Sequence, residues 1–274
     1  MDGDIDASFM GSPYTKVSLG PLGGVFMKKK ADEEFYYEVP HNPDGLMYDE
    51  ANELIEKHCK GVDMSGVHTL KFHTNTWGLS SSNLFADEYI PKMKKLQKID
   101  FSDTVKMRYR SDCPNGCKAI LFAAKDFNII HLDVSYNNFE DNGAKSFAEF
   151  MELNSTLKVL KAHGCGFGKI SVEMMVEASK KNPKLQLTDL DMGRNMFCDE
   201  SLELLATFIK GQKELENLNV EQNIKDHKAG QHKFGLKHIL EAVYERRHQI
   251  RRLDISGNYG VNSEGALDVL QKYI

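Results

Sequence analysis

The sequence predicts an α/β solenoid, with a curved parallel β-sheet on the inside and α-helices on the outside. Two observations support this prediction. A six-residue pattern, apolar–x–apolar–x–x–Asn with occasional substitutes for the Asn, occurs seven times, and its last positions lie 29, 33, 28, 30, 28 and 35 residues apart. Segments with the apolar period of an α-helix follow several copies of the pattern. Each unit therefore supplies one strand and one helix, and successive units stack side by side.

The seven copies share apolar residues at the first and third positions and, in most cases, a small or amide side chain at the sixth. They run Leu70–Asn75, Ile99–Thr104, Leu132–Asn137, Leu160–Cys165, Leu190–Asn195, Leu218–Asn223 and Leu253–Asn258. A period of about 30 residues headed by Leu-x-Leu-x-x-Asn/Cys is typical of leucine-rich repeats, and it predicts about seven to eight of them here. We call the sixth position of the pattern the ladder position. We expect the buried Asn or Cys at this position to bond the backbone of adjacent turns where the strand ends.

The first 47 residues are predicted to form an N-terminal tail and capping segment ahead of the solenoid, which covers residues 48–274. Residues 1–24 are rich in Gly, Ser and Pro and are expected to be loosely ordered. Two short apolar runs, Val25–Met27 and Phe35–Val39, predict a hairpin. This hairpin would cover the sheet edge and the apolar core at the open end of the first repeat.

The remaining elements follow in chain order. A helix is expected over Asp49–Lys60, with Gly61 as its C-cap, and a strand over Thr69–Phe72. Further helices, each with an apolar stripe, are predicted over Asn142–Leu153, Ser201–Lys210, Phe234–Arg246 and Gly265–Ile274. Two units carry extra residues, Val105–Asn115 and Ile224–Lys233, which we expect to form loops on one edge of the solenoid.

The composition is that of a soluble globular chain, with 41% apolar and 27% charged residues and a net charge of −5. The sequence lacks the dense Lys/Arg cluster that would indicate binding to nucleic acid. The acidic start lacks the apolar region of a secretory signal, and no apolar run has the ~18 residues of a membrane span. Five scattered cysteines do not suggest a disulfide framework. We therefore expect a cytoplasmic monomer without a membrane or nucleic-acid partner.

The middle residue of each Leu-x-Leu faces the concave sheet, because side chains alternate across a strand. That column contains Lys71, Asp100, Asp133, Lys161, Asp191, Asn219 and Asp254, so it is mostly acidic. The next column outward contains His73, Ser102, Ser135, His163, Gly193, Glu221 and Ser256. Two interpretations stay open: these are solvated polar positions, or they form a docking surface for a partner with a basic face.

The sequence carries no convincing catalytic pattern. The motifs GxxxxGK[ST], HExxH and GxSxG are absent. His68 and His73 flank a strand, but at five residues apart they face opposite sides of it, which does not favour a metal pair. The chain is therefore expected to be a binding protein without an active site, a metal or a cofactor of its own.

Four segments of the repeat array carry more specific motifs. They are DFSDTVKMR (Asp100–Arg108), LDVSYNNFEDNGAKSFAEFM (Leu132–Met151), DMGRNMFCDES (Asp191–Ser201) and VEQN (Val220–Asn223). They resemble, in the same order and at similar intervals, the DFSD-x-F-T-G-R, L-x-LSDNAFG, GRNRLEN and M-x-QNGI segments of the Ran GTPase-activating proteins. Arg108, Arg194 and Gln222 fall on matching motif positions. The resemblance covers residues 49–274.

The resemblance implies binding to a Ran-type GTPase in its GTP state through one edge of the solenoid, and stimulation of hydrolysis. In that family the activator supplies no arginine finger but holds Ran's own catalytic groups in place. An asparagine just before the fourth ladder position is important there. Here that asparagine aligns with Gly164, while Val105 and Met107 replace the Phe and Gly of the first motif. The positioning role would then fall to His163 or Arg108.

Three functions stay open: a Ran-type GTPase activator, a pseudo-activator that binds without stimulating, and a leucine-rich-repeat scaffold for another protein. The resemblance implies a cytoplasmic location, including the nuclear envelope, and a role in nucleocytoplasmic transport. The candidate partner-binding residues are Asp100, Asp103, Arg108, Asp133, His163, Gly164, Asp191, Arg194 and Gln222. Simpler roles are also open. Arg108 would only solvate an inserted loop, and Arg194 would bond acidic neighbours. Asp100 and Asp103 would order a turn.

Overall fold

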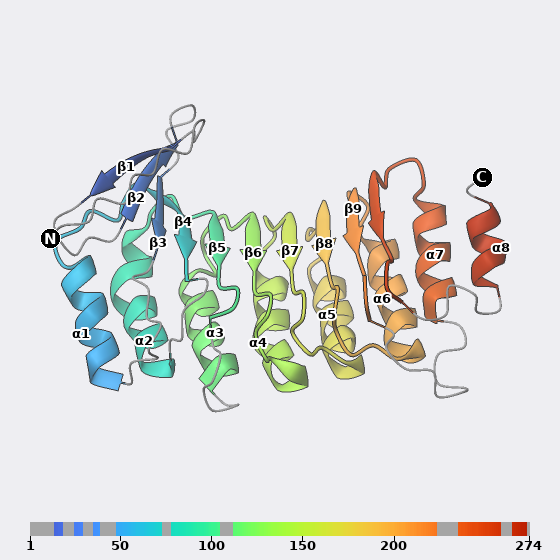
Figure 1. Cartoon of the computed structure of the whole chain (residues 1–274), viewed down its shortest axis with the longest axis horizontal. Coiled ribbons are helices and arrows are strands. Elements are labelled where there is room, and N and C mark those ends of the chain that lie inside the picture. Colours follow the sequence, from blue (N-terminus) through green and yellow to red (C-terminus); the bar gives the residue numbers. More distant parts are fainter. Residues whose placement is uncertain are drawn as a thin grey trace, which may run out of the picture.

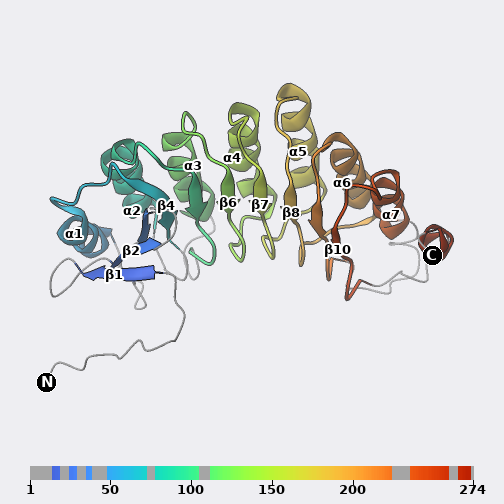
Figure 2. The same cartoon turned by 90° about the horizontal axis from the view of Figure 1, so that it is seen from above.

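The chain forms one arc-shaped array of strand–helix repeats. Figure 2 shows the helices along the outer side of the arc and the strands along its inner side. This computed structural model describes residues 14–18, 25–29, 35–38, 48–72, 78–104, 112–223, 235–258 and 265–272. The predicted fold class, an α/β solenoid with a curved parallel sheet inside and helices outside, is confirmed.

A single sheet runs through the molecule in the strand order β1 to β10. Its repeat strands are all parallel, and Figure 1 shows them side by side along the long axis. They are β4 (Val67–Lys71), β5 (Lys98–Asp100), β6 (His131–Asp133), β7 (Val159–Lys161), β8 (Asp189–Asp191), β9 (Asn217–Asn219) and β10 (Arg252–Asp254). Buried leucines pair across the sheet, for example Leu132 with Leu160, so the apolar positions stay in register.

Three N-terminal strands extend the sheet beyond the first repeat. β2 (Val25–Lys29) and β3 (Phe35–Glu38) are antiparallel, so the predicted hairpin is confirmed. β3 then pairs in parallel with β4 and occupies the edge that the first repeat would otherwise expose. The prediction of a loosely ordered segment over 1–24 is wrong at Tyr14–Ser18, which form β1 and pair with β2. The sequence YTKVS is rich in residues that favour strands.

The helices cover the outer side of the sheet. They are α1 (Tyr48–Cys59), α2 (Leu79–Leu84), α3 (Asp112–Ala123), α4 (Glu140–Leu153), α5 (Lys169–Lys181), α6 (Asp199–Gly211), α7 (Gly235–Glu245) and α8 (Ala266–Gln271). After α2 the chain continues through a π-helical turn at Phe85–Tyr89 and a 3-10 turn at Ile90–Lys92. The five helices predicted with ranges correspond to α1, α4, α6, α7 and α8, and α2, α3 and α5 are the helices of the units for which no range was predicted.

The two predicted insertions have different outcomes. The loop expected over Val105–Asn115 is wrong at Asp112–Asn115, which form the first turn of α3. Pro114 fits there because the first helical turn leaves N–H groups without partners anyway. Residues 105–111 and the whole second insertion, 224–233, lie outside the described part of the chain.

The core lies between the sheet and the helices and runs through the whole array. Leu132 and Leu160, at the centres of β6 and β7, are fully buried in it. Neighbouring helices such as α4, α5 and α6 pack against one another in sequence order. Each repeat therefore contacts mainly the repeats before and after it, as expected for a solenoid.

The ladder residues bond the backbone of neighbouring turns, as predicted. The Asn195 amide donates to the carbonyls of Ala162 and Met192, both at 2.9 Å, and its oxygen accepts from the Cys165 N–H at 3.1 Å. The Cys165 thiol donates to a carbonyl of the preceding repeat at 3.2 Å. Equivalent amide bonds are made by Asn137, Asn223 and Asn258. The predicted ladder residue Asn75 lies outside the described residues. The ladder thus fixes the turns that carry the candidate site.

Candidate protein-binding surface

The turns that follow strands β5–β10 form one edge of the solenoid, which we call the strand-end edge. In each turn the residue just before the ladder position has a left-handed backbone. These residues and their φ angles are Asp103 (52°), Tyr136 (60°), Gly164 (63°), Arg194 (52°), Gln222 (49°) and Gly257 (64°). All except Gly257 donate their N–H to a carbonyl of the next repeat, for example Tyr136 to His163 at 2.7 Å. Four predicted site residues are therefore brought into one column: Asp103, Gly164, Arg194 and Gln222.

The acidic column of the concave face has a structural task. Each Asp or Asn at the end of a strand accepts the backbone N–H two residues further on, which closes the turn. The bonds join Asp100 to Ser102 (3.0 Å), Asp133 to Ser135 (3.0 Å), Asp191 to Gly193 (3.0 Å), Asn219 to Glu221 (2.9 Å) and Asp254 to Ser256 (2.9 Å). Hydrogen bonds from the side chain and backbone of Ser256 lower the pKa of the Asp254 carboxyl. These carboxylates are therefore only partly available to a partner.

The concave face is also less acidic than its middle column suggests. A shallow hollow of about 390 Å³ lies over β7–β10 and is lined by both carboxylates and cations. Asp189 and Asp191 face it together with Lys161 and Arg252. Lys161 also lies 3.6 Å from the carboxylate of Asp133. A partner with a purely basic face would thus meet cations as well as carboxylates here.

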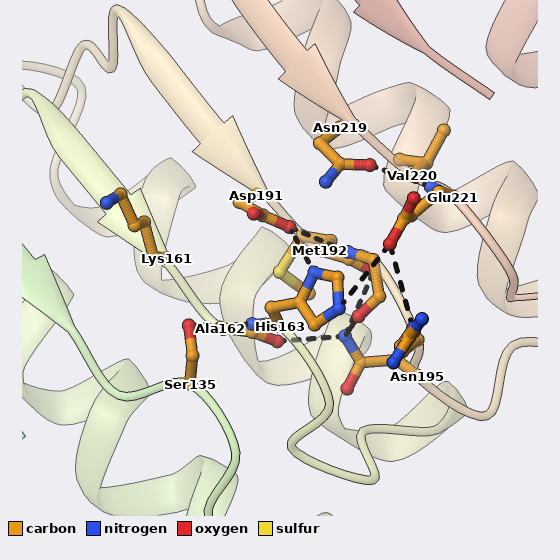
Figure 3. Close-up of polar contacts among 12 residues, drawn as sticks. Ser135, Lys161, Ala162, His163, Asp191, Met192, Asn195, Asn219, Val220 and Glu221 are labelled. Atoms are coloured by element: carbon orange, nitrogen blue, oxygen red, sulfur yellow. Dashed lines mark hydrogen bonds and ion pairs between the residues drawn. The ribbon is translucent and has the colours of Figure 1, made fainter. Parts of the chain in front are cut away.

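His163 lies between carboxylates from the next two repeats, as Figure 3 shows. Its Nδ1 is 3.1 Å from Asp191 Oδ1, and its Nε2 is 3.6 Å from Glu221 Oε1. Only 7% of the residue is exposed, and Nε2 is buried without a hydrogen-bond partner. The Tyr136 ring packs against the imidazole with a centroid distance of 5.1 Å. A neutral imidazole donates from one nitrogen only, so it cannot satisfy both carboxylates at once.

Gly193 provides the space for this arrangement. A Cβ at this position would lie 2.7 Å from His163 Nδ1 and 3.0 Å from Glu221 Cγ. Because Gly193 has no side chain, His163 can reach across one whole repeat to Glu221. The motif resemblance at Gly193 and Arg194 therefore coincides with a packing requirement of this edge.

Arg194 shares the same glutamate. Its Nε lies 3.7 Å from Glu221 Oε1, while its side chain is 48% exposed. The contact agrees with the simpler role expected for Arg194, an ion pair along the edge. Asp103 and Gln222 are half-buried in the same column, whereas Arg108 lies outside the described residues.

Two large apolar side chains project from the strand-end edge. Tyr136 is 52% exposed and Met196 is 72% exposed. The repeat between them has only Gly164 and Gly166 at the corresponding outward positions, both with positive φ. The Tyr136 ring leans over this middle repeat, since it packs on the His163 ring and its Cδ1 would lie 3.2 Å from a Cβ at Gly164. We call the two exposed side chains, with Gly164, Gly166 and Arg194 between and beside them, the Tyr136–Met196 surface.

Sequence reasoning missed Tyr136, Met196 and Glu221 as candidate site residues. A signal for the first two was present. Tyr136 precedes and Met196 follows a ladder position, where the repeat register places a turn and the core needs no large apolar side chain. The sequence places Glu221 in the same outward column as His163, but the column does not show that the two side chains meet across an intervening repeat.

Other kinds of site find little support in the part of the chain that the structure describes. No group of three or more His, Cys, Asp or Glu side chains is placed there to hold a metal ion. Among the same residues, no helix is both long enough and apolar enough to cross a bilayer.

Comparison with known proteins agrees with this geometry. Residues 125–148, which contain β6 and the first part of α4, match the Leucine Rich repeat family. The chain is a leucine-rich-repeat protein. A stretch of 84 residues is 32% identical to NACHT, LRR and PYD domains-containing protein 14 of Mus musculus. That stretch covers 30% of this chain and 8% of the mouse protein, so this leucine-rich-repeat protein corresponds to a small part of its curated relative.

Two solved structures are partly similar to this leucine-rich-repeat protein. They are a tropomodulin C-terminal domain from Caenorhabditis elegans and the structure titled Leiomodin-1 Actin-Binding Site 2. Each has a TM-score of 0.42, 12% sequence identity and 62% coverage of this chain, with 95% and 92% of the respective other chain covered. The family match and the mouse relative support the leucine-rich-repeat class, and membership of the Ran GTPase-activating family stays a prediction.

Proposed function

We propose that this leucine-rich-repeat protein is a protein-interaction scaffold whose partner docks on the Tyr136–Met196 surface. The exposure of two large side chains carries the proposal, because Tyr136 and Met196 are 52% and 72% exposed in the turns of this edge. Tyr, Met and Arg are enriched in protein interfaces, and here all three types lie together. The ladder holds the turns rigidly, so docking needs little ordering of the backbone.

The surface suits a partner that lays one apolar or aromatic side chain against the exposed parts of Tyr136 and Met196. The Tyr136 ring already covers Gly164, whereas a Cβ at Gly166 would have no neighbour nearer than 3.7 Å, so the side-chain-free position beside Met196 is at Gly166. Arg194 would then meet a carboxylate or carbonyl of the partner at the rim. The cytoplasmic location expected from the sequence belongs to the same proposal.

Site-specific crosslinking tests the docking surface. A photo-crosslinking amino acid replaces Met196 in the full chain and, as a matched control, Leu153, which is 55% exposed at the end of α4. We expect a discrete crosslinked protein from position 196 and none from position 153. Equal products at both positions, or none at 196, would contradict the proposal.

Binding energetics give the second part of this test. The captured partner is purified and titrated against Tyr136→Ser, Met196→Ser and the control Leu153→Ser. Anchor residues commonly contribute more than 1 kcal/mol, so each of the first two should weaken binding about tenfold. The Leu153 variant should bind like the parent.

A second candidate function is activation of a Ran-type GTPase. One observation favours it: four residues at motif-related positions lie in a single column along one edge, the kind of surface that the resemblance implies. They are Asp103, Gly164, Arg194 and Gln222. Against stimulation stands Gly164, which has no side chain with which to position Ran's catalytic groups.

Single-turnover GTP hydrolysis by Ran, with and without the chain, tests this candidate alongside a binding titration. Binding without stimulation would indicate a pseudo-activator, and no binding would exclude the Ran-type function. Gly164→Asn is the informative variant, because Asn tolerates a left-handed backbone better than most residues. Its Cβ would lie 3.2 Å from Tyr136 Cδ1, so a small shift of that ring suffices to admit it. Stimulation gained by this variant would support the Ran-type function.

A further inference from the structure

The edge opposite the Tyr136–Met196 surface is strongly basic. It consists of the turns between each helix and the following strand, and we call it the strand-start edge. Its last repeats carry Lys158, Lys180, Lys181, Lys184, Lys210, Lys213, Arg246, Arg247, Arg251 and Arg252. This cluster belongs to a chain whose net charge is −5. The sequence alone does not reveal it, because the cations come from separate repeats.

Part of this positive charge is neutralised within the molecule. Five ion pairs link the edge to carboxylates: Lys158–Glu214 (2.7 Å), Lys180–Glu177 (2.7 Å), Lys181–Glu152 (2.9 Å), Lys210–Glu245 (2.8 Å) and Arg251–Glu216 (3.3 Å). Cations in the last turn of a helix also complement its dipole, which accounts for Lys180, Lys181 and Lys210 without a partner molecule.

A second group of cations has no carboxylate within ion-pair distance among the described residues. Arg246 donates to the Lys210 carbonyl, and Arg247 stacks on the Tyr244 ring at 4.5 Å, so both guanidinium groups are held in place. Lys184 and Lys213 are exposed in the turns after α5 and α6. These four positive charges remain available to an external anion.

A hollow opens between the ends of α5 and α6, beside these lysines. It has a volume of about 480 Å³. Buried Val176 and Leu185 contribute apolar lining, and Lys180 and Lys213 also line it. The Gln186 side chain accepts the Lys213 N–H at 2.6 Å and thereby fixes the turn beside the hollow.

The geometry points to a second docking site on the strand-start edge, which takes an acidic segment of a partner protein with one apolar side chain in the hollow. The carboxylates of the segment would meet Lys184, Lys213 and the two fixed arginines. An apolar-lined hollow suits an amino-acid side chain better than a phosphate, and the interspersed glutamates interrupt the continuous positive stripe that nucleic acid requires. This site goes beyond the proposed function, because it lies on the opposite edge and needs neither Tyr136 nor Met196.

Titration of the full chain with a fluorescein-labelled glutamate peptide carrying one central leucine tests the proposal. We expect saturable binding that Lys184→Glu with Lys213→Glu weakens at least about tenfold, since each reversal replaces an attraction by a repulsion. Lys94→Glu with Lys95→Glu is the matched control, as both lysines are exposed on the same edge near β5 and the net charge changes equally. β5 and β8 are separated by about 14 Å along the sheet, beyond the Debye length of about 8 Å. The control should therefore change affinity less than about twofold.

The hollow is tested separately. Thr207→Trp places a large ring at an exposed position that lines it, and should abolish the preference for the leucine peptide over an all-glutamate peptide. Equal affinity of the parent for both peptides would overturn the proposed seat for an apolar side chain. Equal weakening by the two lysine pairs would overturn a defined site. Tighter binding of phosphatidylserine vesicles or single-stranded RNA than of the peptide would overturn the assignment of a protein partner.

Discussion

At the residue scale, the side chain of Asp191 on the strand-end edge joins two repeats. Asp191 Oδ1 lies 3.0 Å from the Gly193 N–H, which closes its own turn, and 3.1 Å from the His163 ring of the preceding repeat. Asn195, four residues later, bonds buried carbonyls instead. Asp191 thus serves the exposed side of the turn, where charge is tolerated, and Asn195 serves the buried side, where a neutral amide is needed.

Gly193→Ala tests how tightly the His163 cluster is packed. The new methyl group would lie 2.7 Å from His163 Nδ1, so the imidazole or the strand-end turn must shift. Overpacking of this kind costs about 1–3 kcal/mol. The free energy of unfolding in urea measures the effect.

Gly211→Ala is the matched control for that substitution. Nothing lies within 4 Å of a Cβ at Gly211, which ends α6, so the variant should be neutral or gain up to about 1 kcal/mol. If both variants unfold at the same urea concentration, the space at Gly193 is not required by His163.

Residue roles were predictable from the sequence to different degrees. The ladder positions Asn137 and Asn195 follow from the repeat register alone, since any side chain there must satisfy buried backbone groups. The contact between His163 and Glu221 was not predictable. The repeat pattern places Gly193 between them, but it does not show that the imidazole turns along the column to reach Glu221.

At the element scale, the strands were more predictable than the helices. A strand has a fixed place in the six-residue pattern, so β5–β10 follow once the period is known. The predicted loop Val105–Asn115 took in the first turn of α3, because the extra residues of that unit were all assigned to an insertion. No range was predicted for α5, although its buried positions, such as Val172 and Met175, follow a helical period. In an array of strand–helix repeats, each pair of successive strands is joined by one helix, so the presence of these helices follows from the period even where the local sequence does not mark them.

His131 gives strand β6 a pH-dependent contribution to stability. Burial of the imidazole, with Lys161 and Lys98 nearby, lowers its pKa, while Asp133 and Asp100 oppose the shift. A lowered pKa means that the unfolded chain binds a proton more readily than the folded chain. The contribution is therefore fully present above about pH 6.5, the pKa of a free imidazole, and is lost as the pH falls below it.

His131→Gln removes this titration. The free energy of unfolding of the parent should fall relative to that of the variant between about pH 7.5 and 5.5, measured by urea denaturation at each pH. His58, whose pKa is also lowered, is present in both chains and so cancels in the difference. A difference that stays constant over this range would show that His131 titrates alike in both states.

At the scale of the whole molecule, the solenoid separates its surfaces by polarity. The strand-end edge carries the exposed Tyr136 and Met196, and the strand-start edge carries the lysines and arginines of the last repeats. Parallel strands enforce this separation, because every strand begins at one edge and ends at the other. A scaffold of this shape can present two different docking sites without a linker between them.

The linear architecture also predicts how far the destabilisation caused by a core substitution spreads along the array. Leu160 is fully buried at the centre of β7, whereas Leu253 is only partly buried in β10, the last strand of the described sheet. Leu160→Ala should cost about 2–5 kcal/mol, and Leu253→Ala should cost less because less surface was removed from water.

Hydrogen exchange distinguishes the two variants beyond their total stability. Because each repeat is stabilised mainly by its neighbours, Leu253→Ala should lose amide protection in α7, β10 and α8 and keep it in β5–β7. Leu160→Ala weakens the packing of β7 against both neighbouring repeats, so protection should fall on both sides of β7. Uniform loss of amide protection in the Leu253 variant would contradict this prediction. It would mean that all the repeats unfold together as one cooperative unit.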